Sequence, residues 1–245
     1  MVLVESEKRQ RAPRTGTDGK GVFTQIAPES LRDKVVASLK DAFFSGQLKP
    51  GAAIVERRLA EQMKIGSPAV REALIILQEQ GFVQRIANTG TYVNSFTPDE
   101  VRQLYQLRIE YETVALKWAK PRVKDGDFAV LDGLIVAMTE AAVQKNAREF
   151  FERDLDFHRY CWKLSGNKFL ERSLEIMVPS LFAFILNVSS NQTVDDSVAK
   201  RHIAIITALK SIQEPEFTST IRDVLSGFAL DAVSSISGSR ASARD

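Results

Sequence analysis

The stretch from residue 56 to residue 93 constrains the fold of this chain more than any other part of its sequence. Leu59 and Met63 lie four residues apart, so they share one face of a short helix. A second helix follows, and its apolar residues recur with a period of 3.6. These residues are Val70, Ala73, Leu74 and Leu77. Because the two apolar faces can pack together, the pattern predicts a pair of helices joined by a short turn.

The residues between these helices are typical of a tight turn. Gly66 can adopt unusual backbone angles, Ser67 can cap the start of a helix, and Pro68 suits the first helical position. Arg71 follows within the first turn of the second helix. We therefore expect its side chain to project from the exposed start of that helix.

Residues after the second helix predict a small β-hairpin. Gly81 ends the helix. Two β-rich segments, 82–83 and 91–93, then surround the turn residues Asn88 and Gly90. A further helix upstream has an apolar side made of Leu31, Val35, Leu39, Ala42 and Phe43. Three helices and a hairpin are the parts of a winged helix-turn-helix. In this fold the helix that follows the tight turn lies in the DNA major groove.

Residues from about 31 to 93 resemble the GntR family of bacterial transcription regulators. The resemblance rests on Leu48-Lys49-Pro50-Gly51, Leu59-Ala60-Glu61, Val70-Arg71-Glu72-Ala73-Leu74, Gly81-Phe82-Val83 and Gly90. It implies that Arg57 and Arg71 contact DNA and that the tip of the wing, at Thr89 and Gly90, reaches the minor groove. The expected DNA-contacting set is Arg57, Arg58, Ser67, Arg71, Thr89 and Gly90.

The start of the recognition helix departs from the family pattern. Many members have Ser or Thr followed by Arg there, whereas this chain has Gly66 and Ser67. One base-reading arginine is therefore missing, and the operator sequences of the family cannot be transferred to this protein. The alternative role for Arg57, Arg58 and Arg71 is that of solvated surface charges.

Length and composition agree with two folded units in one chain. The 245 residues have room for a small DNA-binding domain and a second domain with its own core. Residues 1–96 carry a formal charge of +4 and the remainder −2, the sign expected if the first part meets phosphate. One cysteine, Cys161, excludes an intrachain disulfide. Without a membrane-spanning run or signal peptide, we expect a bacterial cytoplasmic protein associated with the nucleoid.

The expected organisation has four parts. Residues 1–26 form a mobile basic arm, which either adds nonspecific DNA affinity or has no role. Residues 27–96 form the winged helix-turn-helix, and residues 97–233 form an all-helical effector-binding and dimerisation domain. Residues 234–245 form a small, polar, flexible tail. The predicted fold class is mainly α with a small β wing.

Six helices are predicted in the second domain. Thr97 and Glu100 have the spacing of a capping box at its start. The expected helices span 98–120, 126–144, 147–164, 168–189, 195–212 and 215–233. Gly166 suits the end of one helix and Asn167 the start of the next.

Four polar residues interrupt the apolar stripes of these helices. Asp154 and His158 lie four residues apart beside Phe150, Phe157, Cys161 and Leu164, so both can point at one inward position. His202 falls on the stripe Val198, Ile205, Leu209, and Arg108 falls on the stripe Val101, Leu104, Tyr111, Ala115, Trp118. Burial without partners costs several kcal/mol, so these groups should meet each other, a metal or a ligand.

The second domain resembles the FCD effector-binding domain of the FadR-like branch of GntR regulators. The resemblance rests on Arg108 with Glu112, Asp154-Leu155-Asp156-Phe157-His158, Ser165-Gly166-Asn167 and His202. Many members bind a divalent metal through one Asp and three His, and three of these positions match Asp154, His158 and His202. The family's usual spacing from the preceding histidine implies that the fourth position is Val224, and this chain has no third histidine.

Two interpretations of these residues follow. Either Asp154, His158 and His202 hold zinc, nickel or manganese with an open position, or the two histidines and Asp154 are satisfied core residues. Arg108 either binds an anionic effector or forms a structural ion pair. The expected effector site comprises Arg108, Asp154, His158 and His202.

The resulting prediction is a homodimeric, DNA-binding transcription regulator. We expect a repressor that binds a pseudo-palindromic double-stranded operator and is released by a small organic acid. One alternative is a metal-dependent enzyme using Asp154, His158 and His202 as a facial triad. Another is a nucleoid-binding protein without an effector. The sequence identifies neither the effector nor the operator, the regulated genes or the domain that dominates the dimer contact.

Overall fold

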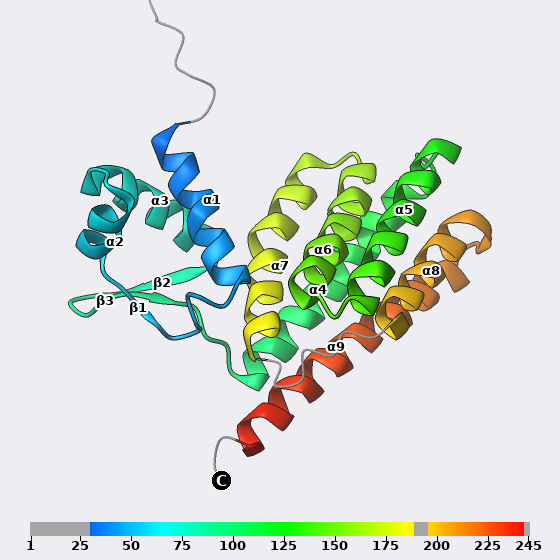
Figure 1. Cartoon of the computed structure of the whole chain (residues 1–245). Coiled ribbons are helices and arrows are strands. Elements are labelled where there is room, and N and C mark those ends of the chain that lie inside the picture. Colours follow the sequence, from blue (N-terminus) through cyan, green and yellow to red (C-terminus); the bar gives the residue numbers. More distant parts are fainter. Residues whose placement is uncertain (1–29, 189–195, 243–245) are drawn as a thin grey trace, which may run out of the picture. The chain divides into compact units, whose positions relative to one another are not determined.

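A computed structural model describes residues 30–188 and 196–242 of the chain. The expected arm and part of the expected tail lie outside these ranges. Helices dominate the described residues, with one small antiparallel sheet near the start (Figure 1). We call residues 31–96 the winged segment and residues 98–242 the helical segment.

The winged segment contains three helices and three strands. In chain order these are α1 (Leu31–Phe44), β1 (Ala53–Ile54), α2 (Glu56–Met63), α3 (Ser67–Glu79), β2 (Val83–Ile86) and β3 (Gly90–Val93). Its core is formed by the apolar faces predicted for the helices, including Val35, Leu39, Phe43, Val70, Leu74 and Leu77, all at most 2% exposed. Leu31 was expected on that apolar side but is 49% exposed, because it is the first residue of α1 and lies beyond the core.

The wing is a three-stranded sheet and not the two-stranded hairpin that the sequence predicted. Strand order is β1-β3-β2, with both pairings antiparallel. The additional strand β1 has only two residues, and it pairs Ala53 with Tyr92 and Ile54 with Thr91. Two residues are too few to show the alternating pattern by which a strand is recognised in a sequence.

The turn between α2 and α3 differs in detail from the prediction. Lys64, and not Gly66, adopts the left-handed conformation, with φ 54°, and it ends α2. Gly66 has an extended backbone and is itself the residue preceding α3, so Ser67 is the first helical residue and does not cap the helix with its side chain. The helix therefore starts one residue earlier than a serine cap would place it.

The helical segment contains α4 (Pro98–Ala119), α5 (Asp125–Val143), α6 (Ala147–Leu164), α7 (Lys168–Val188), α8 (Asp196–Ser211) and α9 (Glu216–Ser242). In Figure 1, helices α4 to α7 lie side by side. The first five helices begin and end within a residue of the predicted positions. Thr97 and Glu100 form the predicted capping box at the start of α4.

Helix α9 is longer than expected, since it continues to Ser242 where the sequence predicted a tail from residue 234. Ile236 explains part of the extension, because it is 2% exposed and belongs to the core of the helical segment. Trp118 on α4 corrects another expectation. It was placed on a buried stripe but is 42% exposed, whereas Val101, Arg108 and Ala115 of that stripe are buried.

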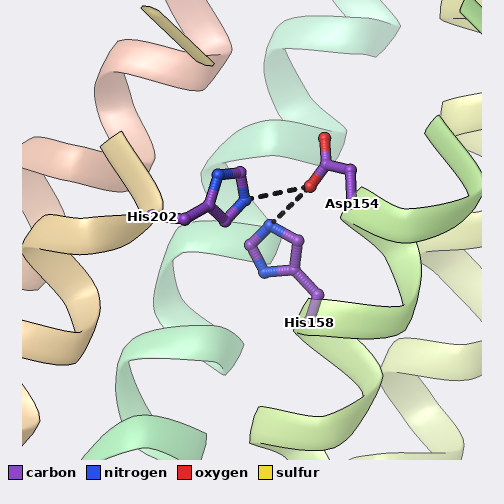
Figure 2. Close-up of side chains that lie close together, drawn as sticks. All are labelled: Asp154, His158 and His202. Atoms are coloured by element: carbon purple, nitrogen blue, oxygen red, sulfur yellow. Dashed lines mark hydrogen bonds and ion pairs between the residues drawn. The ribbon is translucent and has the colours of Figure 1, made fainter. Parts of the chain in front are cut away.

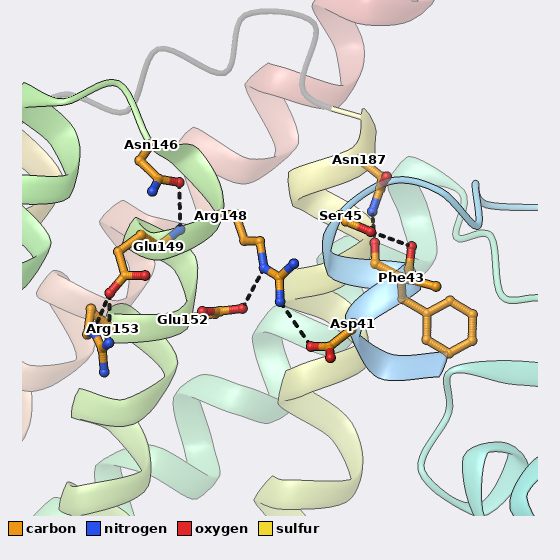
Figure 3. A network of polar contacts seen from close by, with 10 residues as sticks. Asp41, Phe43, Ser45, Asn146, Arg148, Glu149, Glu152, Arg153 and Asn187 are labelled. Carbon is orange, nitrogen blue, oxygen red and sulfur yellow. Dashed lines mark hydrogen bonds and ion pairs between the residues drawn. The ribbon is translucent and has the colours of Figure 1, made fainter. Parts of the chain in front are cut away.

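Helix α7 also packs against the winged segment. Ala183 belongs to the same buried cluster as the core of that segment. The side-chain amide of Asn187 donates to the carbonyl oxygen of Phe43, at the end of α1, over 2.7 Å (Figure 3). On α6, Arg148 Nη2 lies 2.9 Å from Asp41 Oδ1 on α1, and its Nε bonds to Glu152 over 2.8 Å. The two segments are therefore joined by apolar, neutral and charged contacts.

Candidate functional site

A cluster of ionisable side chains lies inside the helical segment. Arg108, Asp154, His158 and His202, the four polar residues predicted on apolar stripes, are 2%, 6%, 2% and 0% exposed. They come from α4, α6 and α8, which are far apart in the sequence. The structure therefore brings together all four residues that the sequence analysis singled out.

Asp154 is the point at which the two histidines meet. Its Oδ1 atom lies 3.0 Å from His202 Nε2 and 3.2 Å from His158 Nε2 (Figure 2). The other nitrogen of His202, Nδ1, lies 2.9 Å from the carbonyl oxygen of Val198. Since a carbonyl oxygen can only accept, Nδ1 carries a proton. Nε2 then faces a carboxylate and needs either a second proton or a cation beside it.

Glu112 completes the cluster, although it was not among the predicted site residues. It is 1% exposed and accepts from Arg108 Nε at 2.9 Å. Its Oε2 lies 2.9 Å from His158 Nδ1, although the direction of the ring N–H is not that of a hydrogen bond. The spacing of four residues from Arg108 could have identified Glu112, because i, i+4 pairs of opposite charge share a helix face.

Arg108 contacts both an acid and a histidine. Its Nη2 lies 2.8 Å from His158 Nε2, and its Cζ lies 4.8 Å from the centre of the Phe182 ring on α7. A guanidinium group can only donate, so the contact with Arg108 is a hydrogen bond only when His158 Nε2 is unprotonated, whereas the contact of this nitrogen with Asp154 Oδ1 needs a proton on it. Any cation bound at that nitrogen would compete with Arg108.

Charge pairing controls the pKa values of this cluster. Burial alone would raise the pKa of Glu112, but Arg108 and His158 overcome it and lower the pKa to about 2. The same holds for Asp154: burial would raise its pKa, but the two histidines outweigh burial and lower it. Burial and Arg108 act to lower the pKa of His158, but Glu112 and Asp154 raise it by more, so the pKa of His158 lies above its usual value. Both carboxylates are therefore ionised at neutral pH.

Asp154 and the two histidines have part of the geometry of a metal site. One ligand atom from each of Asp154, His158 and His202 lies within 4.8 Å of the others. Both histidines direct Nε2 at Asp154, and His202 Nδ1 faces the carbonyl oxygen of Val198, the kind of outer acceptor that usually orients a ligating histidine.

The remaining surroundings of the histidines are apolar. On α9, the Phe228 ring lies 6.0 Å from the His158 ring and 4.9 Å from the His202 ring. Val224, the position predicted to correspond to the fourth family ligand, packs against the core of the helical segment. Neither side chain can bind a metal, so the part of the chain that the structure describes offers three protein ligands here.

The predicted DNA-contacting residues lie on the winged segment. Arg57, Arg58, Arg71, Thr89 and Gly90 are exposed, and Ser67 is partly exposed. Arg57 forms only an exposed pair with Glu61 at 3.4 Å. Arg71 Nε lies 3.2 Å from Glu56 Oε2, and Arg85 Nη2 lies 3.1 Å from Glu56 Oε1. Neither Glu56 nor Arg85 was predicted, because only the folded sheet brings Arg85 near the recognition helix.

Two protein families match this chain. Residues 31–93 match "Bacterial regulatory proteins, gntR family", and residues 103–226, just over half of the chain, match the FCD domain. These ranges correspond to the winged segment and to the region that holds the buried cluster.

Proteins with similar sequences are named as transcription regulators. An uncharacterized HTH-type transcriptional regulator, YdhC of Bacillus subtilis (strain 168), is 25% identical over 70% of this chain and 77% of its own length. The Nta operon transcriptional regulator of Aminobacter aminovorans is 32% identical over 53% of this chain and 61% of its own length. The HTH-type transcriptional repressor RspR of Escherichia coli (strain K12) is 21% identical over 77% and 83%.

Solved structures share the fold. E. coli McbR/YncC matches 86% of this chain and 98% of its own with a TM-score of 0.70 and 20% identity. A putative transcriptional regulator GntR from Rhodococcus sp. RHA1 matches 84% and 97% with a TM-score of 0.69 and 21% identity.

Among the described residues, no helix combines the length and the apolar character needed to cross a membrane.

The family assignment separates the two main functional hypotheses. The gntR family match is described as bacterial regulatory proteins, and the similar proteins above are named as transcription regulators. The metal-dependent enzyme is therefore not supported. The chain belongs to the GntR family of bacterial regulatory proteins, in the branch with an FCD domain, and is a DNA-binding transcription regulator.

Proposed function

We propose that this regulator is a homodimeric repressor whose affinity for a pseudo-palindromic operator falls when a small organic acid enters the buried cluster of the helical segment. One observation supports the effector site above others. Arg108, Glu112, Asp154, His158 and His202 are all at most 6% exposed and form one connected polar group. A purely structural core gains little from so many buried charges, because their desolvation offsets their attraction.

The DNA side of the proposal places α3 in the major groove and the wing near the minor groove. Arg57, Arg58, Ser67 and Arg71 then contact DNA from the two helices, and Thr89 and Gly90 contact it from the tip of the wing, at the end of the turn and the first residue of β3. Gly90 has φ 145°, a conformation that a residue with a side chain rarely adopts. The exposure of these residues supports the assignment.

The metal side of the proposal assigns Asp154, His158 and His202 as ligands of zinc, nickel or manganese. Their converging atoms and the outer acceptor of His202, the carbonyl oxygen of Val198, support this assignment. With three protein ligands, one position stays open for an oxygen atom of water or of the effector. A metal there would supply a Lewis-acidic contact for a carboxylate.

Arg108 supplies the second contact for an acidic effector. Its guanidinium group now donates to Glu112 and His158. A ligand carboxylate could replace His158 as the acceptor and form a charge-assisted hydrogen bond with Nη2. Because Arg108 is only 2% exposed, the cluster must open before a ligand enters.

Helix α7 offers a route from this site to the winged segment. Phe182 covers Arg108 and lies 6.2 Å from the His158 ring, centre to centre. The next residue, Ala183, packs in the core of the winged segment, and Asn187 bonds to Phe43. A ligand that displaces Phe182 would therefore move the helix that holds the end of α1. Such a ligand changes DNA affinity only if it binds the two arrangements differently.

A binding screen tests this function. A duplex is selected from a random pool with the full chain, and its affinity is measured with small organic acids, with and without zinc, nickel or manganese. We expect selection of a symmetric sequence and at least fivefold weaker binding with one class of acid, a typical allosteric coupling. Enrichment of no sequence would contradict the DNA-binding proposal.

The metal is tested by elemental analysis before and after treatment with a chelator. We expect substoichiometric metal that the chelator removes easily, and none in His158→Ala. Val224→His should bind metal more tightly if residue 224 is the fourth ligand position. Absence of metal after purification with added zinc, nickel or manganese would contradict this part, and Asp154 and the two histidines would then be candidates for direct effector contacts or for a buried hydrogen-bond network.

A further inference from the structure

A single carboxylate joins the recognition helix to the wing. Glu56, the first residue of α2, accepts from Arg71 on α3 through Oε2 and from Arg85 on β2 through Oε1, at 3.2 and 3.1 Å. The side chain of Glu56 is 27% exposed, whereas those of Arg71 and Arg85 are 61% and 41% exposed. Both guanidinium groups therefore remain accessible while the carboxylate between them is largely covered.

The register of the sheet explains how Arg85 reaches this position. Arg85 on β2 and Ile54 on β1 both lie opposite Thr91 on the central strand β3. Residues directly opposite one another point to the same face of a sheet, so Arg85 shares the face of Ile54. Ile54 is 6% exposed and belongs to the core under the helices. Arg85 therefore extends along the face of the sheet that meets α2 and α3.

The ion pairs themselves add little to the stability of the fold, because the arginines are exposed to solvent and salt. Their consequence is orientation. Each carboxylate oxygen binds one guanidinium group, so Arg71 and Arg85 are held side by side, and together with Glu56 they carry a charge of +1. The position of Glu56 at the start of a helix also suits its negative charge.

We propose that Arg85 is a further DNA-contacting arginine and that Glu56 positions Arg85 and Arg71 together before DNA binds. The inference rests on the proposed docking of α3 in the major groove. Arg71 then meets base edges, and Arg85 meets the phosphate backbone beside it. The recognition helix begins with Ser67, so Arg85 brings from the wing a cation that the start of this helix lacks. The Glu56 carboxylate repels DNA phosphates, except where Arg71 and Arg85 lie between it and the DNA backbone.

The experiment measures fluorescence anisotropy of the full chain with its selected duplex and with a random duplex of equal length, from about 50 to about 250 mM salt. Arg85→Ala should weaken binding to both duplexes by roughly three- to tenfold, because phosphate contacts are independent of sequence. It should also reduce the slope of log affinity against log salt by about 0.9, the value for one phosphate.

Arg222→Ala is the matched control. Arg222 is 42% exposed and pairs with a carboxylate, Glu110, so it resembles Arg85 in exposure and pairing but lies on α9. We expect the control to retain the wild-type affinity and salt slope. Suppose that the wild type binds a selected duplex and that Arg85→Ala and Arg222→Ala give identical binding curves. This result would overturn the Arg85 contact, while the proposed function would stand. Failure of the wild type to bind any duplex would instead overturn the function.

Glu56→Gln separates positioning from packing, because it keeps the size of the side chain and removes its charge. We expect tighter binding to the random duplex and at least a threefold lower ratio of selected to random affinity. A merely structural role would lower the melting temperature and leave this ratio unchanged. An unchanged ratio would therefore overturn the positioning role of Glu56.

Discussion

Arg108 and Glu112 are ionised side chains with almost no access to solvent, at 2% and 1% exposure. Each is tolerated because the other lies 2.9 Å away and because His158 contacts both. Removing one member leaves a buried charge without its partner, whereas removing both removes the desolvation cost as well. This difference limits which variants can report on effector binding.

Arg108→Ala should lower the free energy of unfolding by roughly 3–5 kcal/mol, because Glu112 stays buried and loses its partner. The double variant Arg108→Met with Glu112→Leu should lose less. Urea unfolding of both proteins checks this difference. Equal losses would contradict the view that the pair is held by mutual charge. Arg108→Lys keeps the charge and is the better variant for measuring the response to an acidic effector, which should fall while basal DNA affinity persists.

Glu112 also predicts a pH dependence of stability. Its pKa is lowered from 4.5 to about 2 in the folded chain, so the carboxylate stabilises the fold above the unfolded value. That contribution is lost as pH falls from about 4.5 through 2, and it amounts to roughly 3 kcal/mol. In a chelator, the difference in unfolding free energy between wild type and Glu112→Gln should shrink by this order over that range. A constant difference would refute the assigned pKa direction.

At the scale of elements, the helices were more predictable than the contacts between them. Thr97 and Asn146 mark the starts of α4 and α6 by local side-chain hydrogen bonds, which follow from residue type and spacing alone. The length of α9 depends on burial of Ile236, which is a tertiary effect. Strand β1 exists only because Ala53 and Ile54 find a partner in β3.

The candidate site shows the same division. Asp154 and His158 could be placed together because their spacing is that of one helix face. Their approach to His202 depends on the tertiary arrangement of α6 and α8, which both pack against α5, and no local pattern specifies it. Arg85 was missed for this reason too, since it reaches Glu56 only after the sheet has formed.

Helix α7 is the element that we expect to couple the site to the winged segment. Asn187→Ala removes the hydrogen bond to the Phe43 carbonyl oxygen, so it should weaken the effect of an organic acid on operator affinity. Affinity without the acid should change less than twofold. Ser173→Ala is the control, because Ser173 is on α7 but bonds within its own helix. A wild-type response in Asn187→Ala would exclude this contact from the coupling route.

For the whole molecule, the proposed mechanism requires two copies. One recognition helix reads few base pairs, and twofold symmetry doubles the number of contacts with a palindromic site. Sedimentation should therefore show a homodimer at micromolar concentration, alone or with the selected duplex. Finding only monomer under both conditions would contradict the symmetric operator.

The most direct test of the account is the affinity of Arg71→Ala for the selected duplex. Arg71 is 61% exposed on the recognition helix and paired only at the surface, so the variant should keep its melting temperature. We predict a loss of roughly 1–3 kcal/mol in binding free energy, measured by anisotropy against the wild type. A folded variant with wild-type affinity would contradict the placement of α3 in the major groove.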